Sequence, residues 1–222
     1  MASRLVDQES GGAGALIAAC VAESGSGAHP YFTGGPLAGG PHAVRNVADA
    51  VHFLCVLHGR HPGIVDLAAG RVTEPAARAW LVEAGAAMAE ERRLLARIAV
   101  AAGGAPSTPG HAASEATVAA QRAALHTLAQ SDRAGCALGA ALAFALDWRP
   151  VRALLDVAAA RLGIDAPAFR LGDPDELRLV ADVAGENALV ERALLFGASQ
   201  LAHQHRGLWD LLEAREQARR DG

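Results

Sequence analysis

A row of mostly apolar residues, spaced alternately three and four apart, runs through the C-terminal part of the chain. The row consists of Val180, Val183, Asn187, Val190, Leu194, Gly197, Leu201, Gln204, Leu208 and Leu211. This spacing places residues on one face of a helix and is typical of the seam of a helical bundle. One continuous helix over residues 174–217 would measure about 65 Å, so we expect a break near Gly185 or Gly197.

The rest of the chain shows the same helical period. It predicts helices over residues 43–58, 75–102, 112–130 and 134–162, with a short one over 11–23. Pro150 predicts a kink or two segments in 134–162. Since no alternating β-branched run occurs, the predicted fold is all-α, an antiparallel bundle of about six to eight helices with a long C-terminal helix or helix pair.

Glycine and proline divide the chain into an arm and a bundle. Residues 1–42 form an N-terminal arm with a Gly/Pro-rich loop, and residues 43–222 form a single helical-bundle domain. Tyr31 and Phe32 in the loop favour packing on the chain's own bundle, with docking on a partner as the alternative. Start signals precede two helices, at Thr73-Glu74-Pro75 with Thr73 as the expected cap, and at Asp173-Pro174-Asp175-Glu176 with Asp173 as the expected cap. A stripe of small residues predicts close approach of another backbone, at Gly135, Gly139, Ala140 and Ala143.

Charge and composition exclude several functions. The basic residues are 20 arginines with no lysine, which excludes a P-loop lysine and Schiff-base chemistry. A net charge of -4 gives no reason to expect nucleic acid as a partner. The apolar run at 134–146 is too short for a membrane span, so no membrane partner is expected.

The cysteines bear on location. There are three and none forms a C-x-x-C pair, so we expect free thiols and a cytoplasmic protein. Ile17-Ala18-Ala19-Cys20 resembles the end of a lipoprotein signal. The acidic leader, with Asp7 and Glu9 beside Arg4, and the short apolar stretch argue against that interpretation.

Polar residues on apolar helix faces are the candidate site residues, because burying them is costly without partners. Asp49, His52, Cys55 and His58 are spaced by three, so neighbours share a face but the full set cannot bind one ion. The alternative is structural, with His52 bonded to Asp49 and His58 at the helix end. His61 follows just after the helix. The candidate metal ligands are His52, His58, His61 and Glu91.

Glu91 lies on its seam between Met88 and Leu95, where a carboxylate needs a cation, a metal or a proton. A salt bridge to another helix is the favoured role. Asn187 and Gln204 on the C-terminal seam are expected to set register or oligomeric state.

Three segments together carry a family resemblance: Leu57–Gly63, Pro106–Gly110 and Leu146–Arg149. They resemble a family of uncharacterised, Ala- and Arg-rich bacterial helical proteins, a domain of unknown function. The resemblance covers most of the chain and implies no activity and no site residue. The predicted topology is also loosely similar to ferritin-like and haem-oxygenase-like bundles, but their Glu-x-x-His ligand pattern is absent from this sequence.

Two functions are compatible with these observations. The first is a binding or assembly protein that forms a homo-oligomer, because a mean hydropathy of +0.17 without a membrane span suggests an apolar interface. Its further partner would be a small molecule or a protein. The alternative is a metal- or cofactor-dependent enzyme with its site inside the bundle. The sequence requires no cofactor, and iron or another transition metal is the expected one for the enzyme.

Overall fold

The computed structural model describes residues 11–103 and 108–221. These residues form nine α-helices and one short 3-10 helix, with no strand, which confirms the all-α prediction. The helices are α1 (Ala13–Ser24), η1 (Ser26–Ala28), α2 (Pro30–Thr33), α3 (Ala43–His58), α4 (Ile64–Ala69), α5 (Pro75–Ala101), α6 (His111–Ala129), α7 (Cys136–Arg161), α8 (Pro174–Ala184) and α9 (Ala188–Arg220). The leader at 4–9 and residues 106 and 107 of the Pro106–Gly110 segment lie outside the described residues.

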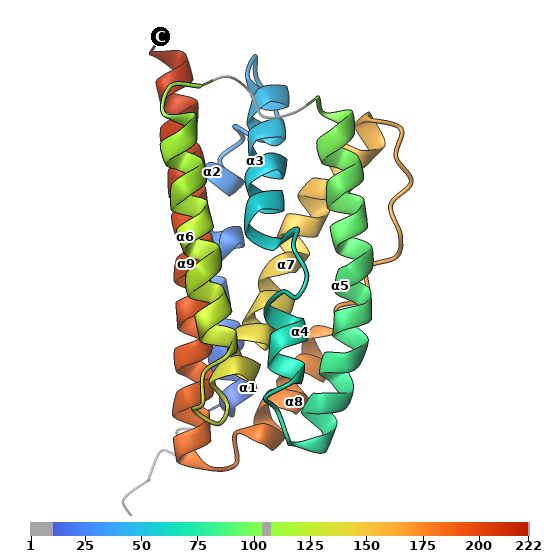
Figure 1. Ribbon diagram of the computed structural model, residues 1–222, viewed down its shortest axis with the longest axis vertical. Helices are drawn as coiled ribbons and strands as arrows, with labels where there is room; N and C mark the ends of the chain where they lie inside the picture. The colour runs from blue at the N-terminus through green and yellow to red at the C-terminus, as the bar shows by residue number, and fades with distance from the viewer. Residues whose placement is uncertain (1–10, 104–107, 222) are drawn as a thin grey trace, which may run out of the picture.

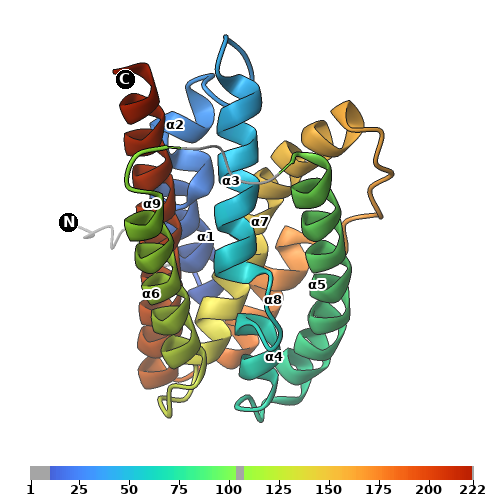
Figure 2. The same cartoon turned by 45° about the horizontal axis from the view of Figure 1, so that its top comes forward.

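The long helices lie side by side along one axis (Figure 1). α7 and α9 form the most extensive helix pair, and α1 packs against α9 and α8. α3 and α4 follow each other along the axis and both contact α5 and α6 (Figures 1 and 2). None of the described helices has the length and apolar run that a membrane span requires.

The C-terminal break falls at Gly185, one of the two predicted positions. α8 ends at Ala184 and α9 begins at Ala188. Asn187 is therefore not a seam residue, because it precedes α9 and its side chain accepts a hydrogen bond from the Leu189 N–H at 2.8 Å. Asp173 caps α8 as predicted. At α5 the cap is Glu74 and not Thr73, since the Glu74 carboxylate accepts from the N–H groups of Ala76 and Ala77.

The predicted small-residue stripe lies against α9. A Cβ atom on Gly139 would come within 2.0 Å of the Leu194 carbonyl oxygen, and one on Gly197 within 2.0 Å of the Cys136 carbonyl oxygen. The two backbones can approach this closely only because glycine has no side chain. α7 continues through Pro150 as one helix, so the alternative of two separate segments is wrong.

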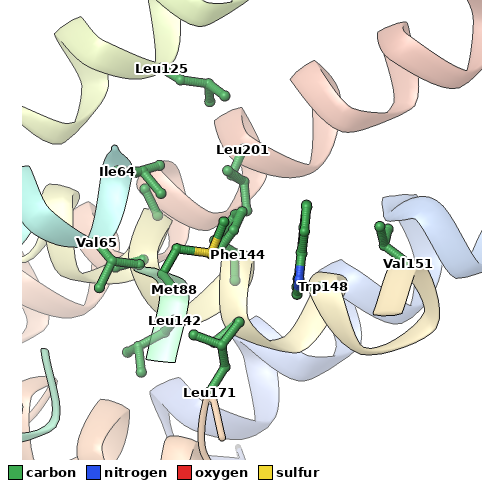
Figure 3. Packing of buried hydrophobic residues seen from close by; sticks show 14 of the residues in the cluster. Ile64, Val65, Met88, Leu125, Leu142, Phe144, Trp148, Val151, Leu171 and Leu201 are labelled. Carbon is green, nitrogen blue, oxygen red and sulfur yellow. The ribbon is translucent and has the colours of Figure 1, made fainter. Parts of the chain in front are cut away.

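The core extends along the whole bundle, and Figure 3 shows its central part. Phe144 and Trp148 on α7 stack with ring centroids 5.2 Å apart. The Gly/Pro-rich loop packs on the same bundle, as predicted, because Tyr31 is buried and Phe32 lies edge-on to Trp209. The described part of the arm therefore contributes to the core.

Candidate functional site

A continuous row of hydrogen bonds crosses the interior of the bundle. His58 Nε2 lies 2.9 Å from His205 Nε2, and His205 Nδ1 lies 2.5 Å from Asp147 Oδ2. Ser26 completes the row, because its Oγ donates to Asp147 Oδ2 at 2.6 Å and its N–H donates to Oδ1 at 2.7 Å. The four side chains come from α3, α9, α7 and η1, and all are at most 6% exposed. We call this set the buried relay.

Local structure explains how the relay assembles. Ser26 begins η1 directly after Gly25, where a Cβ atom would meet Asp147 Oδ1 at 2.2 Å. Glycine at this position therefore lets the loop backbone reach the carboxylate. Asp147 lies on the buried helix α7, in a run of small and apolar residues that brings α9 and its His205 close. The close packing of α7 and α9 thus places the histidine beside the carboxylate.

When His205 is neutral, the hydrogen bonds determine which ring nitrogens carry protons. The Asp147 carboxylate can only accept, so His205 donates through Nδ1–H. Neutral His205 then presents a lone pair at Nε2, which accepts from the Nε2–H of His58. His58 is left with an unprotonated Nδ1, the basic nitrogen of its ring. Carboxylate and histidine act here as orienting groups for the next ring.

Electrostatics keep His58 neutral. Its pKa lies well below the ordinary value of 6.5, first because burial disfavours the charged ring and then because positive charge on His205 or Arg92 would repel a charge on His58. The ring also packs against Phe144 and Trp148, with centroids 5.0 and 5.5 Å away. A neutral imidazole with a free lone pair is a proton acceptor.

A pocket of about 420 Å³ opens beside His58. It lies between the end of α3, the loop after it, α4 and the second half of α6. Leu57, Ile64, Leu67 and Leu125 supply apolar walls. The charged or titratable lining residues are all basic, namely His58, Arg60, His61, Arg122 and His126. Such a pocket suits a small molecule that carries negative charge.

The four residues predicted as metal ligands each have a different hydrogen-bond or ion-pair partner in the structure. His52 Nε2 lies 2.9 Å from Glu115 Oε1 on α6, and His58 belongs to the buried relay. His61 Nδ1 lies 3.2 Å from Asp66 Oδ2. Glu91 pairs with Arg152. His58 and His61 line the same pocket, whereas His52 and Glu91 do not line it.

The structural roles predicted as the alternative for His52 and His58, a bond to Asp49 and a place at the helix end, also differ from the observed contacts. Asp49 does not bond His52, because Asp49 points into the bundle and pairs with arginines of α9. His58 is not confined to the helix end, because its ring reaches across to α9. The spacing by three separates these residues around the helix by enough to give each a different neighbour.

Glu91 forms the salt bridge to another helix that the sequence favoured. Arg152 of α7 donates to Glu91 Oε1 at 2.5 Å, and Trp148 Nε1 donates to Glu91 Oε2 at 3.0 Å. Burial raises the pKa of Glu91, while Trp148 and Arg152 act in the opposite direction. Trp148 therefore contacts both the Glu91 pair and the His58 ring.

Asp49 is the centre of a second buried ion cluster. Arg215 donates to both of its oxygens at 2.8 Å, and Arg219 donates to Oδ2 at 2.7 Å. The Arg215 guanidinium also lies 4.8 Å from the centre of the Phe53 ring. Since these groups are mutually paired and buried, we assign the cluster to holding α3 against α9.

Sequence reasoning missed three of the four relay residues. Ser26 lies in a Gly/Ser segment that looks like low complexity, and Asp147 lies within the segment Leu146–Arg149 that carried only a family resemblance. His205 lies one position after Gln204 of the predicted seam. The signal that would have found Asp147 is a lone carboxylate in an otherwise apolar helical run.

Comparison with known proteins shows to which family the chain belongs. A profile of a family of unknown function, DUF6975, matches residues 21–220. The chain belongs to the DUF6975 family. This confirms the resemblance to an uncharacterised helical family. The DUF6975 match includes all four relay residues and the pocket. Searches of curated proteins and of solved structures found no match.

Proposed function

We propose that this protein binds a small anionic molecule in the pocket beside His58 and exchanges a proton with it through that residue. The observation that carries the proposal is the buried relay, which ends at a histidine lining the pocket. A buried row of Ser, Asp and two His is costly to desolvate, so a role beyond packing is expected of it.

The pocket's charge supports an anionic ligand. Arg60 makes no ion pair with any described residue, and it lies at the rim with His61. Arg122 donates to the Val56 carbonyl oxygen at 3.1 Å, which holds its guanidinium in place. The nearby carboxylate, Asp66, lies 3.1 Å from Arg92 and 3.2 Å from His61, and it makes no ion pair with Arg60 or Arg122. A carboxylate or phosphate group would therefore meet unneutralised positive charge.

The relay supports proton transfer. A proton taken up at His58 Nδ1 makes that ring cationic, and its Nε2–H bond to His205 strengthens. His205 can accept that proton at Nε2, and its own Nδ1–H faces the Asp147 carboxylate. The carboxylate thus stabilises positive charge on either ring.

Histidine NMR tests the proton positions without a ligand. Protein labelled with ¹⁵N at histidine should show, at neutral pH, His58 protonated only at Nε2 and His205 only at Nδ1. The variant Asp147→Asn should move the His205 proton, because an amide can donate to Nδ1. A doubly protonated His58 at neutral pH would contradict the proposal.

Calorimetry tests binding and proton exchange together. Inorganic phosphate and small mono- and dicarboxylates are titrated in two buffers of different protonation enthalpy. At least one anion should bind with proton uptake, and His58→Gln should abolish the uptake. His203→Gln, on an exposed part of α9, is the matched control and should behave as wild type. Arg60→Ala should weaken binding about tenfold. Anion binding without proton uptake would support the anion site but contradict the proposed proton transfer.

A homo-oligomer is the second candidate, and exposed apolar residues favour it. Leu179 and Leu189 are 65% and 69% exposed, and Phe196 is 44% exposed. They lie on α8 and the first half of α9. The binding or assembly role, a cytoplasmic location, and the likeness to ferritin-like and haem-oxygenase-like bundles stay predictions.

A further inference from the structure

A second group of polar side chains lies outside the pocket, where α3 passes the start of α6. His52 Nε2 lies 2.9 Å from Glu115 Oε1, and His111 Nε2 lies 3.5 Å from the same oxygen. One ligand atom from each residue lies within 4.8 Å of the other two. His111 and Glu115 are one helical turn apart on α6, and His52 faces them from α3.

We propose that His52, His111 and Glu115 bind a divalent transition-metal ion, with Zn²⁺ as the best fit. Two imidazoles and one carboxylate are ligands that zinc accepts, and a water would complete four-coordination. Bonds of about 2.0 Å in a tetrahedron separate ligand atoms by about 3.3 Å. The 2.9 and 3.5 Å separations already lie near that value.

The surroundings suit an exchangeable ion. The three side chains are 27%, 36% and 44% exposed, so an ion can enter from solvent and retain water. Phe53 restrains both rings, with centroids 5.0 Å from His52 and 5.9 Å from His111. The site therefore needs small side-chain adjustments and no movement of the helices.

Another cluster, of one histidine and two carboxylates, is a poorer candidate for a metal site. It consists of His29, Asp210 and Glu213. His29 Nδ1 accepts from the Tyr31 N–H at 3.1 Å, so its neutral ring carries the proton on Nε2, facing Asp210. That nitrogen is a donor and has no lone pair for an ion.

One contact limits the affinity of the proposed site. Arg215 Nη2 lies 3.4 Å from His111 Nδ1, and an arginine can only donate there. Coordination through His111 Nε2 moves the His111 proton to Nδ1, facing this guanidinium. Arg215 keeps its two bonds to Asp49, so the change weakens one long contact. We expect His111 to contribute less to affinity than His52 or Glu115.

Equilibrium dialysis against zinc, with elemental analysis, measures the site directly. The wild-type chain should bind one equivalent at micromolar zinc, and zinc should raise its Tm. His52→Ala and Glu115→Gln should each weaken binding at least tenfold and abolish the rise in Tm, with a smaller loss for His111→Ala. Co²⁺ in place of zinc should give the visible absorption of a tetrahedral site.

The controls separate this site from the pocket. His203→Ala removes an exposed histidine elsewhere and should leave binding unchanged. His58→Gln should also leave it unchanged. Loss of zinc in either variant, undiminished binding in His52→Ala, or no binding by the wild type at micromolar zinc would overturn the proposal. Circular dichroism confirms that each variant is folded.

Discussion

His58 is a basic side chain that the fold keeps uncharged. Its pKa lies well below 6.5 because the ring is buried and because His205 and Arg92 lie nearby. In the unfolded chain the same ring has an ordinary pKa and binds a proton as the pH falls below 6.5. The unfolded state then binds more protons than the native state, so acid favours unfolding.

We predict that the unfolding free energy falls as the pH is lowered from about 6.5 to 5, with His58 contributing up to about 1.4 kcal/mol per pH unit. His58→Gln should flatten this slope. The raised pKa of Glu91 acts in the opposite sense, since the native state then holds a proton that the unfolded state releases. Chemical denaturation at several pH values measures how the unfolding free energy depends on pH in the wild type and in His58→Gln. The same pH dependence in both would contradict the assignment to His58.

At the scale of helices, sequence periodicity predicted where helices lie but not which residues face the core along their whole length. The buried face of α9 includes Leu194, Leu201 and Leu208, as predicted. It also includes His205 and Leu212, where the predicted seam had Gln204 and Leu211. A strict seven-residue repeat drifts by about 20° per heptad on a straight helix. The predicted seam therefore passed beside the histidine that completes the relay.

The candidate site was harder to predict than the helices because its members are distant in sequence. His58 and His205 are 147 residues apart, and Ser26 and Asp147 are 121 apart. Helical spacing relates residues only within one helix, so it cannot pair α3 with α9 or η1 with α7. The Glu91 salt bridge was predictable in kind, since a seam carboxylate needs a cation, but its partner Arg152 was not.

The contact between α7 and α9 should tolerate no added side chain. We predict that Gly197→Ala lowers the unfolding free energy by about 2 kcal/mol or more, because the new Cβ would lie 2.0 Å from the Cys136 carbonyl oxygen. Gly85→Ala on α5 is the control. Its Cβ would meet only a side-chain oxygen of Asp66 at 3.3 Å, and alanine gains up to about 1 kcal/mol over glycine in a helix.

Thermal and chemical unfolding measure both variants. Destabilisation confined to Gly197→Ala supports a close backbone contact between the two central helices. Equal stability of the two variants would mean that α7 and α9 are farther apart in solution.

The whole molecule leaves apolar residues uncovered on α8 and the start of α9. If this surface mediates self-association, light scattering should give twice the chain mass of 22.7 kDa for the wild type. Leu189→Glu combined with Phe196→Glu should return the mass to that of one chain, because two buried charges oppose the interface. Val100→Glu, at an exposed position on α5, is the control and should stay dimeric. A wild-type monomer at micromolar concentration would remove the self-association proposal.

The row of hydrogen bonds from Ser26 through Asp147 and His205 to His58 should link the N-terminal segment thermodynamically to the pocket that His58 lines. Ser26 gives two hydrogen bonds to Asp147, and Asp147 orients His205 toward His58. Linkage is reciprocal. If docking of the segment makes protonation of His58 more favourable, protonation of His58 makes docking of the segment more favourable by the same free energy. Binding of a ligand in the pocket should therefore slow hydrogen exchange at the Ser26 amide, which lies outside the pocket.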